Sequence, residues 1–481
     1  MIASVPMSSV RPLYIDGRWV STEAASEVRS PWDGHEVAKV ALASSVEMEH
    51  ATAAACRAFQ ETRRLSRRER ADLLRSIASW VGRHKDELAS TMTEEMGKPL
   101  QFSRAEVDRC VTTFNLAAEE ALRFTGEVVP VDIEPHTKGF HAMTVLVPMG
   151  PIAAISPFNF PLNLVAHKLA PALAVGSTMV LKPARQTPLE ALALAQAVHE
   201  AGAPAGAFNV VNCEPQVGET LATDERFPYL TFTGSVGVGW RLKKLAWKKR
   251  VTLELGGNAA CIVHQDADLD YAVKKCLTGG FGQAGQSCIS VQRILVHEPV
   301  ASAFEERFIA GVKGMKTGDP RDPETVVGPV IDSGAAQRLE NWISEAVKGG
   351  ARLLAGGRRD GNLVQPTVIG DASKELKVSC QEVFGPVVTL SRYRTFEEAV
   401  LAADDSAYGL QAGIFTHDLR LIRHAVENLH VGGLMVNDTP TTRVDSMPYG
   451  GVRDSGVGRE GPRYAMHEMS EPRLILFNLN H

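Results

Sequence analysis

The chain has 481 residues, of which 44% are hydrophobic and 22% are charged, and its formal net charge is -5. This length allows about three domain-sized units with large buried cores. The modest net charge gives no electrostatic reason to expect nucleic acid or an anionic membrane as a partner, so small molecules are the expected ligands.

The ends and the apolar stretches of the chain give no sign of export or of a membrane span. The N-terminus, MIASVPMSSVRPLYIDGRW, lacks the basic start and apolar run of a secretory signal. The most apolar long stretch, 162–181, is interrupted by Asn163, His167, Lys168 and Pro171, so it falls short of roughly 20 consecutive apolar residues. We therefore expect a cytoplasmic protein.

Seven cysteines are scattered along the chain without a C-x-x-C pair. This pattern predicts free thiols in a reducing compartment, with no structural zinc or other metal site. Most of the cysteines are expected to be inert core residues, because unpaired cysteine packs like a small hydrophobic side chain.

The first part of the chain is predicted to be helical. Segments 46–62, 66–95 and 100–123 carry apolar residues at three- and four-residue spacing, which is typical of helices that cover a sheet. From about residue 140, short apolar runs alternate with helix-like segments, which indicates parallel sheets with crossover helices. A first series of strands is expected at 152–156, 177–181, 207–211, 229–233 and 251–253. A second α/β series is expected with strands at 260–263, 292–297, 386–391, 412–416 and 433–436.

One predicted helix has clear start and stop signals. Thr187 is a candidate N-cap, Pro188 suits the first turn, Glu190 completes a capping box and Gly202 ends the helix. Two further segments, 127–146 and the C-terminal EPRLILFNLN, are expected to form strands that pair with each other. They either reach across a subunit interface or form a plain sheet edge.

Four loops that follow strands of the first series carry polar residues or glycine, and loops of this kind meet at the carboxyl edge of a parallel sheet. They begin at residues 156, 182, 233 and 254, and the third strand of the series is the exception. The segment 234–239, GSVGVG, opens a helix whose backbone N–H groups could face a phosphate, although a glycine-rich turn without a ligand explains it equally well. Lys182 and Arg185 on a neighbouring loop could hold ribose or phosphate oxygens.

The segment 281–290, FGQAGQSCIS, is expected to form the other side of this cleft. Cysteine acts as a nucleophile in its thiolate form, and a position near a helix terminus or a cation can lower its pKa. Cys288 is therefore the candidate nucleophile, whereas a single cysteine without such a context is more often structural.

These motifs occur together in one order along the chain. They are PFNFP (157–161), KPA (182–184), FTGS (232–235), ELGG (254–257), GQSC (285–288), EVFGP (382–386) and PYGG (448–451). In this respect the chain resembles the NAD(P)-dependent aldehyde dehydrogenase superfamily, and most of all its lactaldehyde and succinate-semialdehyde branch.

The resemblance implies an α/β fold with a Rossmann-type parallel-sheet domain for the cofactor, a second α/β catalytic domain and a small β oligomerisation arm. The cofactor-binding domain would comprise residues 1–125 and 145–255, and the catalytic domain residues 256–465. The oligomerisation strands would be 126–144 and 466–481, which implies a homodimer or homotetramer.

The same resemblance assigns chemical roles. Cys288 would attack the aldehyde to form a thiohemiacetal, and the side-chain amide of Asn159 with the backbone N–H of Cys288 would stabilise the oxyanion. After hydride transfer, Glu254 would act as the general base for the water that hydrolyses the thioester to a carboxylic acid. Glu382 would bind the nicotinamide ribose, Phe384 would lie beside the nicotinamide and Ser235 would meet the pyrophosphate. The other implied cofactor residues are Ser156, Phe158, Lys182, Arg185, Thr233, Gly234 and Val238.

The chain differs from many NAD-using relatives at one position. They carry a glutamate for the adenosine ribose where this chain has Arg185. A guanidinium can pair with a 2′-phosphate, so we predict that NADP is preferred to NAD.

By the same resemblance, the aldehyde tunnel would be lined by Asn163, His167, Ser287, Ile289 and the loop 438–447. Arg443 in that loop either binds a carboxylate or phosphate of the substrate or pairs with Asp438 or Asp445. Small polar aldehydes are the expected substrates, with succinate semialdehyde and lactaldehyde as candidates.

Two alternative functions remain open, and nucleic-acid binding is not expected. A coenzyme-A-acylating aldehyde dehydrogenase would pass the thioester to a thiol, but Glu254 provides a base for water. A non-catalytic binding protein could retain the same fold. The basic run 241–250, RLKKLAWKKR, could bind nucleic acid, but Leu242, Leu245 and Ala246 share one face, which favours a solvated helix with a buried apolar side.

Overall fold

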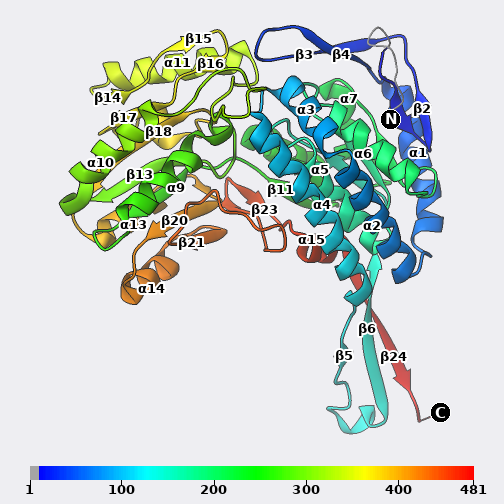
Figure 1. Ribbon diagram of the computed structural model, residues 1–481. Helices are drawn as coiled ribbons and strands as arrows, with labels where there is room; N and C mark the ends of the chain where they lie inside the picture. Colours follow the sequence, from blue (N-terminus) through cyan, green and yellow to red (C-terminus); the bar gives the residue numbers. More distant parts are fainter. Residues whose placement is uncertain (1–9, 481) are drawn as a thin grey trace.

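A computed structural model describes residues 10–480 of the chain (Figure 1). Two sheets covered by helices form the body of the molecule, and a narrow β-arm extends away from it. The α/β fold class predicted from the sequence is confirmed. The outer limits of the predicted domains, at residues 1 and 481, lie outside the described residues, and the domain limits stay a prediction.

The first sheet has eight strands. They span Leu13–Ile15 (β1), Arg18–Val20 (β2), Ile152–Ile155 (β7), Met179–Lys182 (β8), Phe208–Val210 (β9), Tyr229–Thr233 (β10), Arg250–Glu254 (β11) and Gly456–Val457 (β23). Their order is β2-β1-β9-β8-β7-β10-β11-β23. The strands β9, β8, β7, β10 and β11 run parallel, as predicted from their apolar runs. Every residue of β7, β8 and β10 is buried, as is typical of a parallel sheet covered on both faces.

Helices from the first part of the chain, together with a helix near its C-terminus, cover this sheet. They span Ser45–Thr62 (α1), Arg67–Arg83 (α2), Lys85–Met96 (α3), Leu100–Arg123 (α4), Asn163–Val175 (α5), Leu189–Glu200 (α6), Pro215–Thr223 (α7), Val236–Leu245 (α8) and Pro462–Glu468 (α15). The helix predicted over 66–95 is divided into α2 and α3 at His84, which leaves helical geometry and caps both. In the basic run after residue 240, Leu242 and Ala246 are buried as predicted, whereas Leu245 is exposed.

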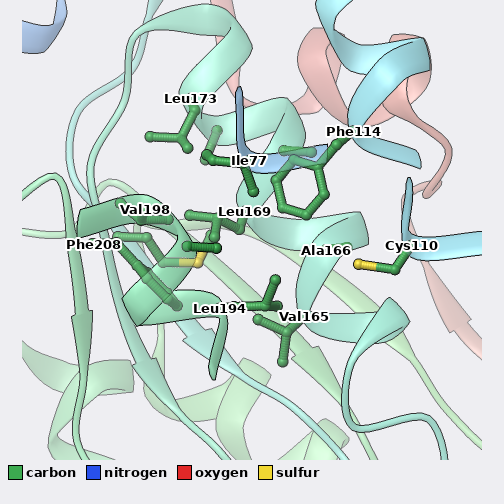
Figure 2. Close-up of a cluster of buried hydrophobic side chains, with 14 of the residues drawn as sticks. Ile77, Cys110, Phe114, Val165, Ala166, Leu169, Leu173, Leu194, Val198 and Phe208 are labelled. Carbon is green, nitrogen blue, oxygen red and sulfur yellow. The ribbon is translucent and has the colours of Figure 1, made fainter. Parts of the chain in front are cut away.

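Helix α5 lies in the centre of the largest hydrophobic core (Figure 2). Every one of its residues is buried, and α4 and α2 pack over it. Leu169 and Phe114 meet in this core, beside Cys110, and all seven cysteines of the chain are free thiols. The apolar stretch 162–181 is therefore a buried helix followed by a buried strand. No helix within residues 10–480 is long and apolar enough to cross a membrane.

The start of α6 differs from the prediction. The Thr187 hydroxyl donates to the carbonyl of Phe158 instead of capping the helix, and Glu190 is buried instead of closing a capping box. The backbone N–H of Leu189 donates to a carboxylate oxygen of Glu95, 3.1 Å away. A carboxylate from α3 therefore caps this helix. Gly202, with φ of 78°, follows its end as predicted.

The second sheet has seven strands. They span Ala259–Val263 (β12), Val291–His297 (β13), Arg352–Ala355 (β14), Thr367–Gly370 (β17), Val387–Tyr393 (β18), Gln411–Phe415 (β20) and Gly433–Val436 (β21). Their order is β14-β17-β18-β13-β12-β20-β21, and only β14 joins antiparallel. The predicted strands of the second series are confirmed, whereas β14 and β17 were not predicted.

The helices and short elements of this second unit surround its sheet. The helices span Leu269–Phe281 (α9), Glu298–Lys313 (α10), Ser333–Lys348 (α11), Lys377–Cys380 (α12), Phe396–Asp404 (α13) and Leu419–Asn428 (α14), with a 3-10 turn at Gly282–Gly285. The short strands are Arg359–Asp360 (β15), Leu363–Val364 (β16), Tyr408–Gly409 (β19) and Val452–Arg453 (β22).

The arm contains the two segments that were predicted to pair. Strand β24 (Ser470–Asn478) pairs antiparallel with β6 (Phe140–Pro148) along its whole length, and β5 (Val128–Val129) joins the other edge of β6. A 3-10 turn at Pro135–Thr137 lies between β5 and β6. The arm leaves several apolar side chains exposed, among them Val128, Ile133, Leu474 and Leu479.

The N-terminal segment contains strands that were not predicted. Strands β1 and β2 form a hairpin through Asp16 and Gly17, which have φ angles of 53° and 73°. The dipeptide Asp-Gly between apolar residues is a hairpin signal that could have identified this turn. A second hairpin joins β3 (Ala25–Arg29) to β4 (Glu36–Ala41).

Candidate active site

A cleft of about 1300 Å³ contains residues from both units of the molecule. All of the predicted catalytic and cofactor-binding residues line it, and they are Ser156, Phe158, Asn159, Lys182, Arg185, Thr233, Gly234, Ser235, Val238, Glu254, Cys288, Glu382 and Phe384. The loops after β7, β8, β10 and β11 supply one wall, as expected at the carboxyl edge of a parallel sheet. The structure therefore brings these residues together, while their chemical roles stay predictions.

Cys288 lies on the loop between the 3-10 turn and β13. Gln283, Ala284 and Gly285 all have positive φ angles, so the chain makes an unusual bend just before the cysteine. Gly257 of the ELGG motif allows this loop to approach, because a Cβ atom at residue 257 would lie 2.2 Å from the carbonyl oxygen of Cys288. The motifs ELGG and GQSC are therefore in direct contact.

The thiol of Cys288 has one hydrogen-bond partner, the hydroxyl of Tyr449, with a distance of 2.9 Å between Sγ and the oxygen. Burial raises the pKa of the Cys288 thiol to about 12, although the hydrogen bond from Tyr449 acts in the opposite direction. Burial thus has a larger effect on the pKa of Cys288 than any nearby cation or helix end. The thiol is therefore protonated in the resting enzyme. Its use as a nucleophile requires a base.

Glu254 ends β11 beside the cleft and is 2% exposed. Neither carboxylate oxygen has a hydrogen-bond partner among the described residues. Burial raises its pKa well above the usual value, and Glu460 adds to this effect. A Cβ atom at Gly450 of the PYGG motif would lie 2.9 Å from one of these oxygens, so glycine at this position allows the backbone to approach the carboxylate closely. A buried carboxyl group without partners is costly, which is typical of groups retained for function.

Asn159 is held between two loops of the site. Its side-chain amide donates to the backbone carbonyl of Gln286 at 3.1 Å, and the side chain of Gln283 donates to the carbonyl of Asn159 at 2.7 Å. A side-chain amide has two N–H groups, so one remains available to a ligand in the cleft.

The helix α8 begins where the sequence predicted a phosphate-binding turn. Ser235 precedes its first turn, and Gly239 packs so tightly that a Cβ atom there would lie 2.4 Å from a methyl group of Leu255. The free backbone N–H groups of this helix start can receive an anion.

Glu382 and Phe384 lie at another part of the cleft wall. Glu382 accepts a hydrogen bond from the backbone N–H of Gly257 at 3.0 Å, and burial raises its pKa to about 7. Phe384 has a φ of 47° and meets Phe158 edge to face, with 5.7 Å between the ring centroids.

Arg185 is not free. Its guanidinium donates to Glu214 with a distance of 2.7 Å, and both side chains are half exposed on the cleft wall. Sequence analysis missed Glu214 because it treated the loop after the third strand as lacking polar residues. The nearby ammonium of Lys182 donates to the carbonyl of Pro183 at 2.9 Å.

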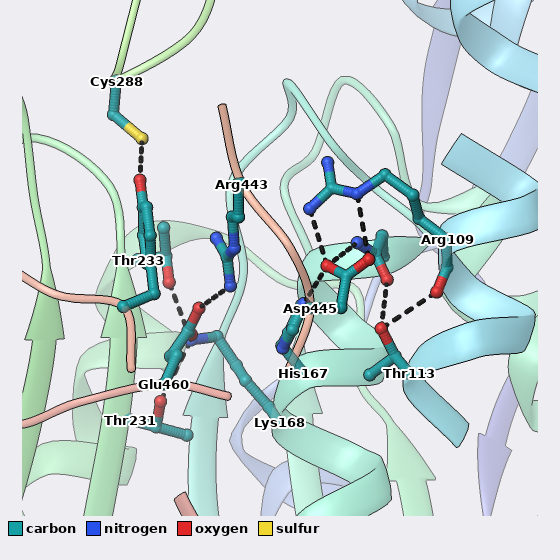
Figure 3. Close-up of polar contacts among 12 residues, drawn as sticks. Arg109, Thr113, His167, Lys168, Thr231, Thr233, Cys288, Arg443, Asp445 and Glu460 are labelled. Carbon is teal, nitrogen blue, oxygen red and sulfur yellow. Dashed lines mark hydrogen bonds and ion pairs between the residues drawn. The ribbon is translucent and has the colours of Figure 1, made fainter. Parts of the chain in front are cut away.

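A buried polar network is centred on Asp445 (Figure 3). Asp445 accepts two hydrogen bonds from Arg109, at 2.7 and 3.1 Å. The Nε2 atom of His167 lies 2.8 Å from a carboxylate oxygen of Asp445. Asn163 also donates to Asp445, at 3.4 Å. The residues Asn163 and His167 thus contact Asp445 and are not part of the cleft lining. Arg109 and Asp445 join segments far apart in the sequence, so no local pattern could have identified their pairing.

Arg443 pairs with neither of the residues considered in the sequence analysis. Its partner is Glu460, 3.1 Å away, which also binds Lys168 at 3.0 Å (Figure 3). Asp438 pairs instead with Lys275. The Arg443 side chain is 6% exposed, its Nε atom has no hydrogen-bond partner among the described residues, and its guanidinium lies 3.7 Å above the ring of Tyr449.

Ser287 and Ile289 flank the cysteine on opposite sides. Ser287 lines a small pocket with Glu382 and Phe384, and buried Ile289 packs beside Tyr449. The large cleft does not include either side chain.

The fold and the cleft define a class of oxidoreductase, and comparison with known proteins identifies it. Residues 19–475 match the aldehyde dehydrogenase family, and the chain belongs to this family. It is an NAD(P)-dependent enzyme that oxidises small aldehydes.

Relatives match over nearly the whole chain. The 3-sulfolactaldehyde dehydrogenase of Priestia aryabhattai is 43% identical over 468 residues, which cover 97% of this chain and 98% of the relative. Aldehyde dehydrogenase 21 of Physcomitrella patens, solved in complex with the reaction product succinate, is 42% identical, with a TM-score of 0.96 and coverage of 98% and 99%. Glyceraldehyde-3-phosphate dehydrogenase of Methanocaldococcus jannaschii, complexed with NADP, is 36% identical, with a TM-score of 0.92 and coverage of 95% and 100%.

Proposed function

We propose that this enzyme oxidises a small polar aldehyde to the carboxylic acid, with Cys288 as the nucleophile and Glu254 as the general base. The observation that carries the proposal is the buried carboxylate of Glu254, which has no hydrogen-bond partner within residues 10–480 and lines the same cleft as the thiol. A raised pKa allows this carboxylate to accept a proton near neutral pH.

The reaction has two halves. Glu254 takes the thiol proton, directly or through a water molecule, and the sulfur of Cys288 attacks the aldehyde carbon to form a thiohemiacetal. The amide of Asn159 and the backbone N–H of Cys288 stabilise its oxyanion. A nicotinamide cofactor, when bound, would supply the hydride acceptor, and Cys288 would then hold the substrate as a thioester. Glu254 releases the thiol proton to solvent and then removes a proton from the water that hydrolyses the thioester; the departing sulfur of Cys288 takes this proton back as the acid is released.

Hydrolysis is favoured over transfer to coenzyme A, because Glu254 in the cleft provides a base for water. Acid formation by the purified enzyme without coenzyme A supports this route, and acid formation only with coenzyme A contradicts it.

The substrate is proposed to carry a negative charge at its far end, with succinate semialdehyde as the first candidate and lactaldehyde as the neutral alternative. Arg443 supports this choice, because its buried guanidinium lies above Tyr449, which contacts Cys288, and its Nε atom has no hydrogen-bond partner in the part of the chain that the structure describes. The succinate complex of the related plant enzyme and the sulfonate in the name of the bacterial relative agree with an anionic substrate. Four residues outside the cleft lining are proposed to shape the substrate tunnel from behind, and they are Asn163, His167, Ser287 and Ile289.

We propose that NADP is preferred to NAD, with Arg185 as the partner of the 2′-phosphate. The guanidinium of Arg185 must then leave its ion pair with Glu214 and pair with the phosphate instead. Turnover of succinate semialdehyde, lactaldehyde and hexanal with each cofactor, followed by nicotinamide absorbance, tests both choices. Fastest turnover of hexanal, or a higher kcat/KM with NAD, contradicts them.

The arm is proposed to join subunits into a homodimer or homotetramer. Its exposed apolar residues would be covered by a second copy of the chain. Light scattering of the intact protein and of a variant with charged residues at Leu474 and Leu476 tests this assembly, and a monomeric wild-type protein would contradict it.

A further inference from the structure

Tyr449 is the one member of the PYGG motif whose side chain contacts the proposed nucleophile. It is 2% exposed, and its hydroxyl oxygen lies 2.9 Å from Sγ of Cys288. No other hydrogen-bond partner of this hydroxyl is found within residues 10–480. The motif thus places a phenol at the sulfur and, one residue later, the glycine whose backbone approaches Glu254 closely.

The position of this phenol is fixed from three sides. The backbone of Tyr449 exchanges two hydrogen bonds with that of Glu460, at 3.1 and 2.7 Å. The guanidinium of Arg443 lies 3.7 Å from the ring centroid, and Glu460 holds Arg443 in turn. Lys168, which donates to Thr231 and Thr233 of β10, completes the chain of contacts from the first sheet to the sulfur. A side chain restrained in this way presents its hydroxyl in one direction.

We propose that Tyr449 is a positioning residue for the nucleophile, whose hydroxyl donates to Sγ of Cys288, holds the sulfur in one orientation and stabilises the thiolate. This inference rests on the proposed role of Cys288. The phenol keeps its own proton, because burial raises the pKa of Tyr449 further above its usual value. The thiol proton leaves for Glu254, and the hydrogen bond from the phenol then becomes charge-assisted and stronger.

The arrangement explains how a buried thiol can be used at all. Burial opposes the charged form of Cys288, and Tyr449 is the only side chain that donates a hydrogen bond to it among the described residues. The cation above the ring withdraws electron density from the phenol, which makes its O–H group a better donor. Cys288 thereby gains a partner for its negative charge without an adjacent histidine or metal ion.

The test measures alkylation of Cys288 by iodoacetamide in the full-length protein without aldehyde or cofactor, with the modified residue assigned by peptide mass. Tyr449→Phe is expected to slow this reaction at least about tenfold near neutral pH, because a hydrogen bond to a charged group is lost. Tyr271→Phe is the matched control, since Tyr271 lies exposed on α9, and it should react like the wild type. An unchanged alkylation rate in Tyr449→Phe overturns the proposal.

A second series separates this role from a structural one. Fluorotyrosine and difluorotyrosine at position 449 retain the ring and make the phenol a stronger donor, so the alkylation rate should rise in the order Phe, Tyr, fluorotyrosine, difluorotyrosine. If the alkylation rate of Cys288 does not depend on the acidity of the phenol, the proposal is overturned, even where Tyr449→Phe fails to fold correctly. Because no turnover is needed, the result is independent of the proposed function, which fails separately if Cys288→Ala still oxidises aldehydes.

Discussion

Arg185 and Glu214 form an ion pair on the wall of the cleft, with 2.7 Å between Nη1 and Oε2. Both side chains are half exposed, so water screens the pair and its contribution to stability is small. The pair matters for ligand choice, because the carboxylate competes with a 2′-phosphate for the guanidinium and can itself accept a hydrogen bond from a 2′-hydroxyl group.

Removing the charge of Glu214 should therefore shift cofactor choice. We expect Glu214→Gln to raise the ratio of kcat/KM for NADP over NAD by about tenfold, because Arg185 is then free for the phosphate. Arg185→Gln should lower the same ratio. The control is Glu219→Gln, which disrupts a pair with Arg241 on the neighbouring helices outside the cleft lining and should leave the ratio unchanged. Equal ratios in all four proteins would mean that the pair plays no part in the choice.

A second prediction concerns the substrate. We expect Arg443→Gln to reduce kcat/KM for succinate semialdehyde at least about tenfold more than for butanal, since only the former has a carboxylate for the guanidinium. Loss of the buried pair with Glu460 will also reduce stability, and comparing two aldehydes on one variant cancels that effect. An equal loss of kcat/KM for both aldehydes would show that the guanidinium of Arg443 does not bind the carboxylate of the substrate.

The sequence predicts the parallel strands well, because each is a short apolar run whose residues are buried on both faces, as β8 and β10 show. It also identifies the cleft residues that lie at or directly after the ends of those strands, such as Asn159, Lys182 and Ser235, whereas Glu382 and Phe384, which precede β18, are identified only from the family resemblance. It fails where distant segments decide the structure. Glu95 caps α6 from another helix, Arg109 meets Asp445 across the fold, and Tyr449 reaches Cys288 from the C-terminal part of the chain. No local periodicity or spacing encodes such contacts.

A third prediction follows from the pKa of Glu254, which burial raises above the usual value. The general base must be ionised, so the rate of thioester hydrolysis should rise with pH as Glu254 loses its proton, and it should be low in acid. This limb of the pH profile of kcat should be absent in Glu254→Gln, which has no ionisable group there. A pH-independent rate in the wild type, measured with the same aldehyde, argues that another group activates the water.

A fourth prediction concerns stability. Burial lowers the pKa of His167 to about 4, whereas an unfolded histidine has a pKa of about 6.5. Between these values the unfolded chain takes up a proton that the folded chain does not, so the free energy of unfolding decreases as pH falls through this window, by up to about 3 kcal/mol. Above about pH 6.5 the histidine is neutral in both the folded and the unfolded chain, so its titration no longer reduces the free energy of unfolding.

His167→Gln has no such proton to bind. Thermal unfolding from pH 7 to pH 5 should therefore lower the Tm of the wild type more than that of the variant. Parallel Tm curves would show that His167 titrates alike in both states.

The central claim is that Cys288 carries the substrate as an acyl group that Glu254 removes. The most direct measurement is the intact mass of Glu254→Gln after incubation with NADP and succinate semialdehyde, followed by peptide mapping. The account predicts that one succinyl group per subunit accumulates on Cys288, slowly because the thiol must lose its proton to bulk water in this variant, together with one equivalent of reduced cofactor and little further turnover. The absence of an acyl group after cofactor reduction, or an acyl group on another residue, would contradict it.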